Sequence, residues 1–149
     1  MTTRLALIRH GAAESRAARD EDRALTPSGV GEVASTGEQL VALGWLPDLG
    51  WCSPARRARE TRDALSESVG DVPWIVEAGF YRGSAHAVLA ALGRLEFDDV
   101  TVWAVGHNPV WEDVASLLSG ETIRLDTGDA ALLERGADGW RRVDVVRAG

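Results

Sequence analysis

The segment 5–11, LALIRHG, constrains this chain more than any other stretch. Four consecutive apolar residues are followed at once by Arg9, His10 and Gly11. A short apolar run of this kind is typical of a buried strand in a parallel sheet. In open α/β sheets ligands bind just outside the carboxyl ends of the strands, which is where these three residues lie. A guanidinium, an imidazole and a glycine at that place favour an anion, most naturally a phosphoryl group.

The rest of the chain alternates strand-like and helix-like segments. Further strands are expected over about 49–52, 72–80 and 100–105, and a closing hairpin pairs 130–134 with 140–146. This alternation predicts an α/β fold: a three-layer α/β/α sandwich with a mainly parallel central sheet and an antiparallel edge hairpin. A length of 149 residues suits one domain, so residues 1–149 are expected to form a single domain.

Short capping motifs predict where the helices begin. They are Thr26-Pro27, Ser53-Pro54, Ser84 and Asn108-Pro109. The helix that starts at Ser84 is expected to run to about Leu95, and the last helix is expected to end at Gly120.

Charge and cysteine content limit the partners that the chain can have. It carries 23 acidic and 16 basic residues, a formal net charge of −7, which does not favour broad contact with nucleic acid or an anionic membrane. No nucleic-acid or membrane partner is therefore expected. A lone cysteine, Cys52, cannot form an internal disulfide, and no signal peptide or apolar run of membrane-spanning length stands in the sequence, so a cytoplasmic location is expected.

Three predicted strand ends carry residues that suit one phosphoryl-binding site. Arg9 and His10 follow the first strand, Arg57 lies just after the second, and His107 follows the fourth. Because the carboxyl ends of parallel strands meet at one edge of a sheet, we expect these side chains to converge. A neutral imidazole is a competent nucleophile near pH 7, and guanidinium groups neutralise charge on phosphoryl oxygens. The pattern predicts His10 as the nucleophile, Arg9, Arg57 and His107 as the groups that hold the oxygens, and Gly11 as the point where the backbone approaches the substrate.

Two other motifs lack the context that their chemistry requires. The segment 29–34, GVGEVA, matches the letters of a dinucleotide fingerprint, but a helix cap precedes it instead of a strand. A cysteine phosphatase loop needs an arginine six positions after its cysteine, and the sixth residue after Cys52 is Ala58. No His, Cys or carboxylate residues show metal-ligand spacing, so neither a metal nor a cofactor is expected.

Taken in order, the motifs resemble those of the histidine phosphatase, or phosphoglycerate-mutase-like, superfamily. They are RHG at 9–11, LTxxG at 25–29, SPxxRAxxT at 53–61 and GHNP at 106–109, and together they span most of the chain. The resemblance implies that His10 becomes the phosphohistidine, that Arg9, Arg57 and His107 complete the phosphate pocket, and that no metal is used. The chain is most similar to the small bacterial phosphohistidine phosphatases of the SixA type, because it reads RHGxA at 9–13 and lacks the long insertions of mutase-like members.

The general acid is the part of the site that the sequence leaves open. Mutase-like members are expected to carry a catalytic glutamate and a Gly- and Trp-containing motif after the third strand, where this chain reads EAGFYRG at 77–83. The candidates are Glu14, Asp20 and Asp22, in the long charged loop 12–24, and Glu77. A phosphohistidine releases an imidazole, which is a good leaving group, so it needs a general acid less than a phosphate ester does.

These points lead to one functional hypothesis and two alternatives. The leading hypothesis is a metal-independent phosphatase that works through a phosphohistidine enzyme intermediate on protein phosphohistidine. Its partner is then a phosphohistidine-containing signalling or carrier protein. The alternatives are a phosphatase of a small ester, such as a sugar or nucleotide phosphate, and a non-catalytic module that binds phosphate groups. Trp111, four positions after His107, is a candidate for the rim of the pocket.

Overall fold

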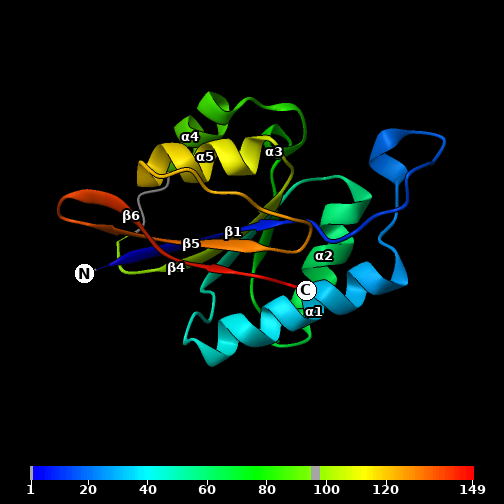
Figure 1. Cartoon of the computed structure of the whole chain (residues 1–149), viewed down its shortest axis with the longest axis horizontal. Helices are drawn as coiled ribbons and strands as arrows, with labels where there is room; N and C mark the ends of the chain where they lie inside the picture. The colour runs from blue at the N-terminus through cyan, green and yellow to red at the C-terminus, as the bar shows by residue number, and fades with distance from the viewer. Residues whose placement is uncertain (1, 95–97) are drawn as a thin grey trace.

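The computed structural model describes residues 2–94 and 98–149 (Figure 1). In these residues six strands form one sheet in the order β3-β2-β4-β1-β5-β6. The strands are β1 (Thr3–Arg9), β2 (Leu49–Cys52), β3 (Trp74–Val76), β4 (Thr101–Gly106), β5 (Ala130–Gly136) and β6 (Gly139–Val146). The helices are α1 (Pro27–Ala42), α2 (Arg56–Ser66), α3 (Gly79–Arg82), α4 (Ala85–Gly93) and α5 (Val110–Ser119), and a 3-10 turn covers Asp20–Asp22.

The sheet is mainly parallel with an antiparallel edge, as the sequence predicts. Strands β1 to β4 pair in parallel, whereas β5 pairs antiparallel with both β1 and β6. Figure 1 shows α1 and α2 on one face of the sheet and α3, α4 and α5 on the other. The predicted three-layer α/β/α sandwich is therefore confirmed. The loop 12–24, in blue, extends from the end of the sheet where β1 finishes.

Strand β1 lies inside the sheet and contributes to both core layers. Leu5 and Leu7 pack on the face of α5, against residues that include Trp111, while Ala6 and Ile8 pack on the face of α1 and α2. All four β1 side chains are at most 2% exposed. Because successive side chains in a strand point to opposite faces, a strand covered on both faces requires a continuous apolar run.

The third strand is shorter than predicted. Only Trp74–Val76 is extended, whereas the prediction covers 72–80, and Gly79–Arg82 forms a helical turn. The cause is Phe80, whose ring packs edge-on between the rings of Trp51 and Trp111 at centroid distances of 5.4 and 4.9 Å. The chain has to leave the sheet to place this ring in the core.

Two of the four predicted helix starts are confirmed with their side-chain caps, whereas the other two helices begin without one. Thr26 Oγ1 accepts from the Gly29 amide at the start of α1, and Ser84 Oγ accepts from the Ala87 amide at the start of α4.

Helix α2, however, begins at Arg56 and not at Pro54, with Ala55 as its N-cap and no side-chain cap. The Ser53 hydroxyl contacts His107 Nε2 at 2.7 Å and accepts from the Ala55 amide at 3.3 Å. Helix α5 begins at Val110, with Pro109 as its N-cap, and ends at Gly120 as predicted. The predicted end of the α4 helix at about Leu95 lies outside the described residues. No helix in the described ranges is both long and apolar enough to cross a membrane.

Trp111 belongs to the core and not to the rim of a pocket. Its side chain is fully buried, and its Nε1 donates to the Ala104 carbonyl at 3.1 Å. The ring covers Gly106 so closely that a Cβ at that position would overlap it. Glycine at the end of β4 is therefore a packing requirement.

The first testable prediction concerns this contact. Gly106→Ala is expected to destabilise the protein by about 1–3 kcal/mol, because the added methyl group forces the Trp111 ring to move. Gly31→Ala is the matched control, because nothing lies within 4 Å of a Cβ there. In the interior of α1 the same change is expected to stabilise by about 0.5–1 kcal/mol. Urea unfolding of the two variants measures both effects, and equal midpoints would contradict the prediction.

Candidate active site

The pairing register of neighbouring strands determines where the site lies. Arg9 of β1 is opposite Gly106 of β4, and the His10 amide donates to the Gly106 carbonyl at 3.0 Å. His10 and His107 therefore leave adjacent strands side by side, with ring centroids 5.2 Å apart. Strand β2 pairs with the other edge of β4, which brings Ser53 to the same end of the sheet.

His10 is buried, with 8% of its surface exposed. Its Nδ1 lies 2.8 Å from the Gly11 carbonyl oxygen. A carbonyl only accepts, so Nδ1 carries the ring proton and Nε2 keeps a free lone pair. Burial lowers the pKa of His10 to about 4, and the charges of Arg57 and Arg9 act in the same direction. The ring is therefore neutral near pH 7, with Nε2 available as a nucleophile.

His107 is a second neutral imidazole. Burial lowers its pKa to about 3, assisted by repulsion from charge on His10 and Arg57. Its Nε2 lies 2.7 Å from Ser53 Oγ, a group that donates or accepts and so suits either tautomer. This contact fixes the orientation of the ring. The same hydroxyl also accepts from the Ala55 amide at 3.3 Å.

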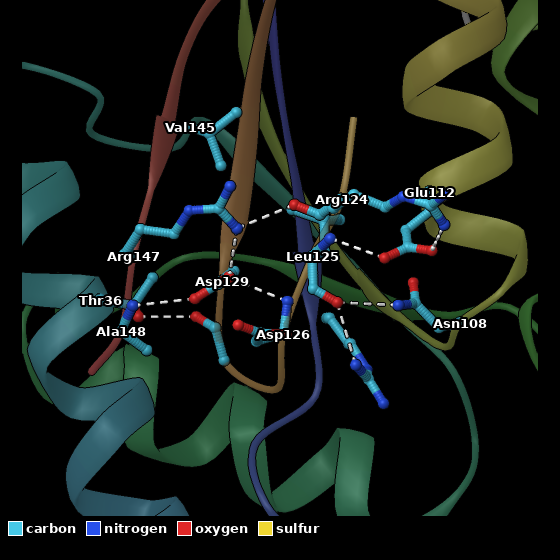
Figure 2. Close-up of polar contacts among 12 residues, drawn as sticks. Thr36, Asn108, Glu112, Arg124, Leu125, Asp126, Asp129, Val145, Arg147 and Ala148 are labelled. Atoms are coloured by element: carbon cyan, nitrogen blue, oxygen red, sulfur yellow. Dashed lines mark hydrogen bonds and ion pairs between the residues drawn. The ribbon is translucent and has the colours of Figure 1, made fainter. Parts of the chain in front are cut away.

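Arg9 is oriented by a backbone carbonyl. Its Nη1 donates to the Leu125 oxygen at 2.9 Å. Figure 2 shows the same oxygen accepting from Asn108 Nδ2, also at 2.9 Å, while the Leu125 amide donates to Glu112 Oε2 at 2.7 Å. Hydrogen bonds therefore fix both the carbonyl and the amide of Leu125. Sequence reasoning missed this support because a main-chain carbonyl carries no residue-type signal.

A neighbouring set of contacts in Figure 2 braces the strand ends. Asp129 is 2% exposed and accepts from the Asp126 amide, the Ala148 amide and the Arg147 guanidinium at 2.8, 3.0 and 2.7 Å. Its carbonyl accepts from the Arg9 amide at 3.0 Å. Residues near the C-terminus therefore support the backbone that carries Arg9.

Arg57 lies in the first turn of α2 and is 6% exposed. Its Nη1 donates to the Asp20 carbonyl at 2.9 Å, and its Nη2 donates to Asp20 Oδ2 at 3.1 Å. Loop 12–24 thus folds back onto the guanidinium. The structure accordingly brings all four predicted side chains, Arg9, His10, Arg57 and His107, to one end of the sheet.

Three buried nitrogens of this group have no hydrogen-bond partner in the described residues: Arg9 Nε, Arg57 Nε and His107 Nδ1. The two guanidinium nitrogens are donors, and His107 Nδ1 is a donor in the tautomer in which Ser53 donates to Nε2. Leaving a buried donor unsatisfied costs about 1–3 kcal/mol. A phosphoryl group satisfies such donors with charge-assisted hydrogen bonds, which are stronger than neutral ones. The arrangement therefore suits an oxyanion.

Gly11 contributes through packing. Its amide donates to Thr61 Oγ1 at 3.1 Å, so that N–H is not free for a substrate in this structure. A Cβ on Gly11 would lie 2.9 Å from both the Gly29 carbonyl oxygen and Val33 Cγ1. The glycine lets the start of α1 approach the strand end.

The four general-acid candidates have different surroundings. Asp20 accepts from Tyr81 Oη, Arg23 Nη1 and Arg57 Nη2 at 2.7, 3.0 and 3.1 Å. These donors hold the pKa of Asp20 well below its usual range, so it is ionised near pH 7 and has no proton to give. Glu77 follows β3 and accepts from the Gly79 amide at 3.2 Å, while Glu14 and Asp22 are exposed on the loop.

Tyr81 of α3 is a member of the site that sequence reasoning missed. Its ring centroid lies 5.7 Å from that of His107, and its hydroxyl donates to Asp20. The segment 77–83 carries no motif that would have indicated it. Tyr81 reaches the site only because Phe80 anchors the helical turn in the core.

Cys52 adjoins the site without facing it. The residue is fully buried at the end of β2, where its Sγ donates to the Ser53 carbonyl at 3.1 Å. Burial raises the pKa of this thiol to about 12. It is present as the protonated thiol at every physiological pH.

Comparisons with known proteins found a family model, sequence relatives and solved structures that match the chain. Residues 5–81 match the family model of the histidine phosphatase superfamily (branch 1). An uncharacterised chloroplastic protein of Arabidopsis thaliana is 32% identical over 94% of this chain and 70% of its own length. A candidate phosphohistidine phosphatase SixA from Agrobacterium tumefaciens superposes with a TM-score of 0.86 and 27% identity, covering 97% of each chain. The protein histidine phosphatase SixA complexed with tungstate has the same fold, with a TM-score of 0.89 and 20% identity over 97% of each chain.

The second prediction is that His10 stays neutral into the acidic range. With a pKa of about 4, its ring signals should change little between pH 7 and pH 5. An imidazole at the reference value of about 6.5 would be almost fully protonated at the lower pH. Histidine-selective NMR measures the titration, and the loss of one signal set in His10→Ala assigns it. A midpoint near the reference value would contradict the burial argument.

The same shift links pH to stability. The folded-state pKa of His10 lies below the unfolded value, so the unfolded chain binds more protons as the pH falls below about 6.5. The contribution of His10 is therefore fully present above that value and is lost as the pH falls toward 4. His10→Gln is expected to lose less unfolding free energy over this window than the unchanged protein, by up to about 3 kcal/mol.

Proposed function

The chain belongs to the histidine phosphatase superfamily, and from this premise we propose that it hydrolyses protein phosphohistidine through a phosphohistidine at His10. The observation that carries the proposal is the neutral His10 ring, whose Nε2 keeps a free lone pair. The ring lies beside His107, and the charges of Arg9 and Arg57 help to lower its pKa. A nucleophile and an oxyanion pocket at one point are the two parts that covalent phosphoryl transfer requires.

Two displacements complete the reaction. His10 Nε2 attacks phosphorus, the bond from phosphorus to the leaving group breaks, and the electron pair of that bond departs with the leaving group. Water then attacks the phosphohistidine, which releases phosphate and restores the imidazole. In both steps Arg9, Arg57 and His107 hold the nonbridging oxygens, where charge has to be neutralised.

The hydrogen-bond partners of Asp20 and Glu77, two of the candidates for the general acid, support phosphohistidine as the substrate. Asp20 is held as a carboxylate by three donors, and Glu77 is occupied with a backbone amide. An alkoxide leaves poorly without a proton, whereas a ring-protonated phosphohistidine leaves as a neutral imidazole. The 27% identity to the candidate SixA from Agrobacterium tumefaciens supports the same substrate class.

This substrate implies a macromolecular partner, a phosphohistidine-containing signalling or carrier protein. A location in the cytoplasm is part of the proposal, and the single buried cysteine, which suits a reducing compartment, supports it.

The third prediction tests the covalent intermediate. Rapid quenching with a labelled phosphodonor should trap phosphate on the protein that is acid-labile and base-stable, and His10→Ala should trap none. Arg57→Ala should lower kcat/KM by a factor of about 10² to 10³, as for loss of one preorganised donor. Arg59→Ala is the control, because Arg59 is exposed and its side chain donates only to the Pro54 carbonyl among the contacts described.

A substrate panel distinguishes the proposed phosphohistidine phosphatase from the two alternative functions. kcat/KM for a phosphorylated histidine domain should exceed that for sugar and nucleotide monophosphates. The reverse order would assign the enzyme to small esters. Tight phosphate binding without hydrolysis of any substrate would leave only a binding module.

A further inference from the structure

Asp20 lies where three elements meet. It belongs to loop 12–24, accepts from Arg57 of α2 through Oδ2, and accepts from Tyr81 of α3 through the same oxygen. Arg23, on the same loop, donates to Oδ1 at 3.0 Å. The carboxylate is thus fixed by tertiary contacts, although its side chain is 53% exposed.

Asp20 lies beside the proposed phosphate pocket, because it contacts Arg57, one of the groups that the proposal assigns to the phosphoryl oxygens. His10 is buried, whereas Asp20 lies at the solvent boundary, bonded to a guanidinium of the oxyanion pocket. Tyr81 connects it to the ring of His107, 5.7 Å away between centroids. In an in-line displacement the leaving group departs on the side away from the nucleophile. Because His10 is buried and the Asp20 side chain is half exposed, the proposal places the departing group on the side of Asp20.

A carboxylate held ionised accepts hydrogen bonds but donates none. It has about four acceptor positions, and within residues 2–94 and 98–149 the side chains of Arg23, Arg57 and Tyr81 use three, so one stays open on Oδ1. Such a group cannot protonate an alkoxide. It can bind the N–H of an imidazolium ring and stabilise the charge on that ring.

We propose that Asp20 makes the site selective for phosphoryl groups carried on a protonated imidazole, by accepting a hydrogen bond from the ring N–H of the departing group. This inference rests on the proposed phosphohistidine chemistry. The bond from His10 Nε2 to phosphorus forms while the substrate P–N bond breaks, and the electron pair of the broken bond returns to the departing nitrogen. The proton on the other ring nitrogen stays in place, so the product leaves as neutral imidazole. Tyr81 acts as a positioning residue that holds the carboxylate toward the pocket.

The fourth prediction uses two small substrates that share the phosphoryl group and differ in the leaving group. Phosphoimidazole leaves as imidazole, and 4-nitrophenyl phosphate leaves as a phenolate that needs no proton. Asp20→Asn should lower the ratio of kcat/KM for the first to that for the second by about 10- to 100-fold, the value of a hydrogen bond to a charged group. Tyr81→Phe should lower the same ratio by less.

Glu21→Gln is the matched control. Glu21 is the next acidic residue of the same turn and pairs with Arg19, so its loss should leave the ratio unchanged. The ratio does not depend on the fraction of folded enzyme, so partial misfolding of a variant does not affect it.

The other outcomes are distinguishable. If Asp20→Asn lowers both substrates equally, Asp20 only orients Arg57 and the inference is wrong. If it improves both equally, the carboxylate competes with the phosphoryl group for Arg57, and the inference is again wrong. If the unchanged protein hydrolyses neither substrate, the proposed function fails and the inference fails with it.

Discussion

The parallel pairing of β1 with β4 is the contact on which the rest of the site depends. The register that sets Arg9 opposite Gly106 places the next residue of each strand, His10 and His107, side by side. Backbone hydrogen bonds maintain this spacing, and the apolar side chains of β1 prevent a slip, because a one-residue shift would turn Leu7 and Ile8 to the wrong core layers. Two residues far apart in sequence are therefore held together without a direct bond between them.

The charge of the pocket is local and only partly compensated. Arg9 donates to a neutral carbonyl, whereas Arg57 is paired with the carboxylate of Asp20. With both histidines neutral, the pocket carries a modest positive charge inside a chain of net charge −7. Such a site attracts a phosphoryl group at short range without a broad basic surface that would bind polyanions.

The parts of the site that could be predicted are those that local sequence encodes. An apolar run followed at once by Arg9 and His10 identifies a strand end, and the general rule for parallel sheets then brings distant strand ends together. The contacts that orient these groups could not be predicted. Leu125 contributes a main-chain carbonyl, and Tyr81 reaches the site because the neighbouring Phe80 ring packs in the core. The Ser53 hydroxyl contacts His107. Each depends on tertiary packing, which residue type does not indicate.

The burial of Cys52 lowers the sensitivity of this protein to oxidants. Peroxides react with thiolates, and a thiol whose pKa is raised to about 12 offers almost none. The imidazole of His10 does not enter the sulfenic-to-sulfonic series at all. Phosphoryl transfer through His10 should therefore continue under oxidative stress that inactivates enzymes with a cysteine nucleophile.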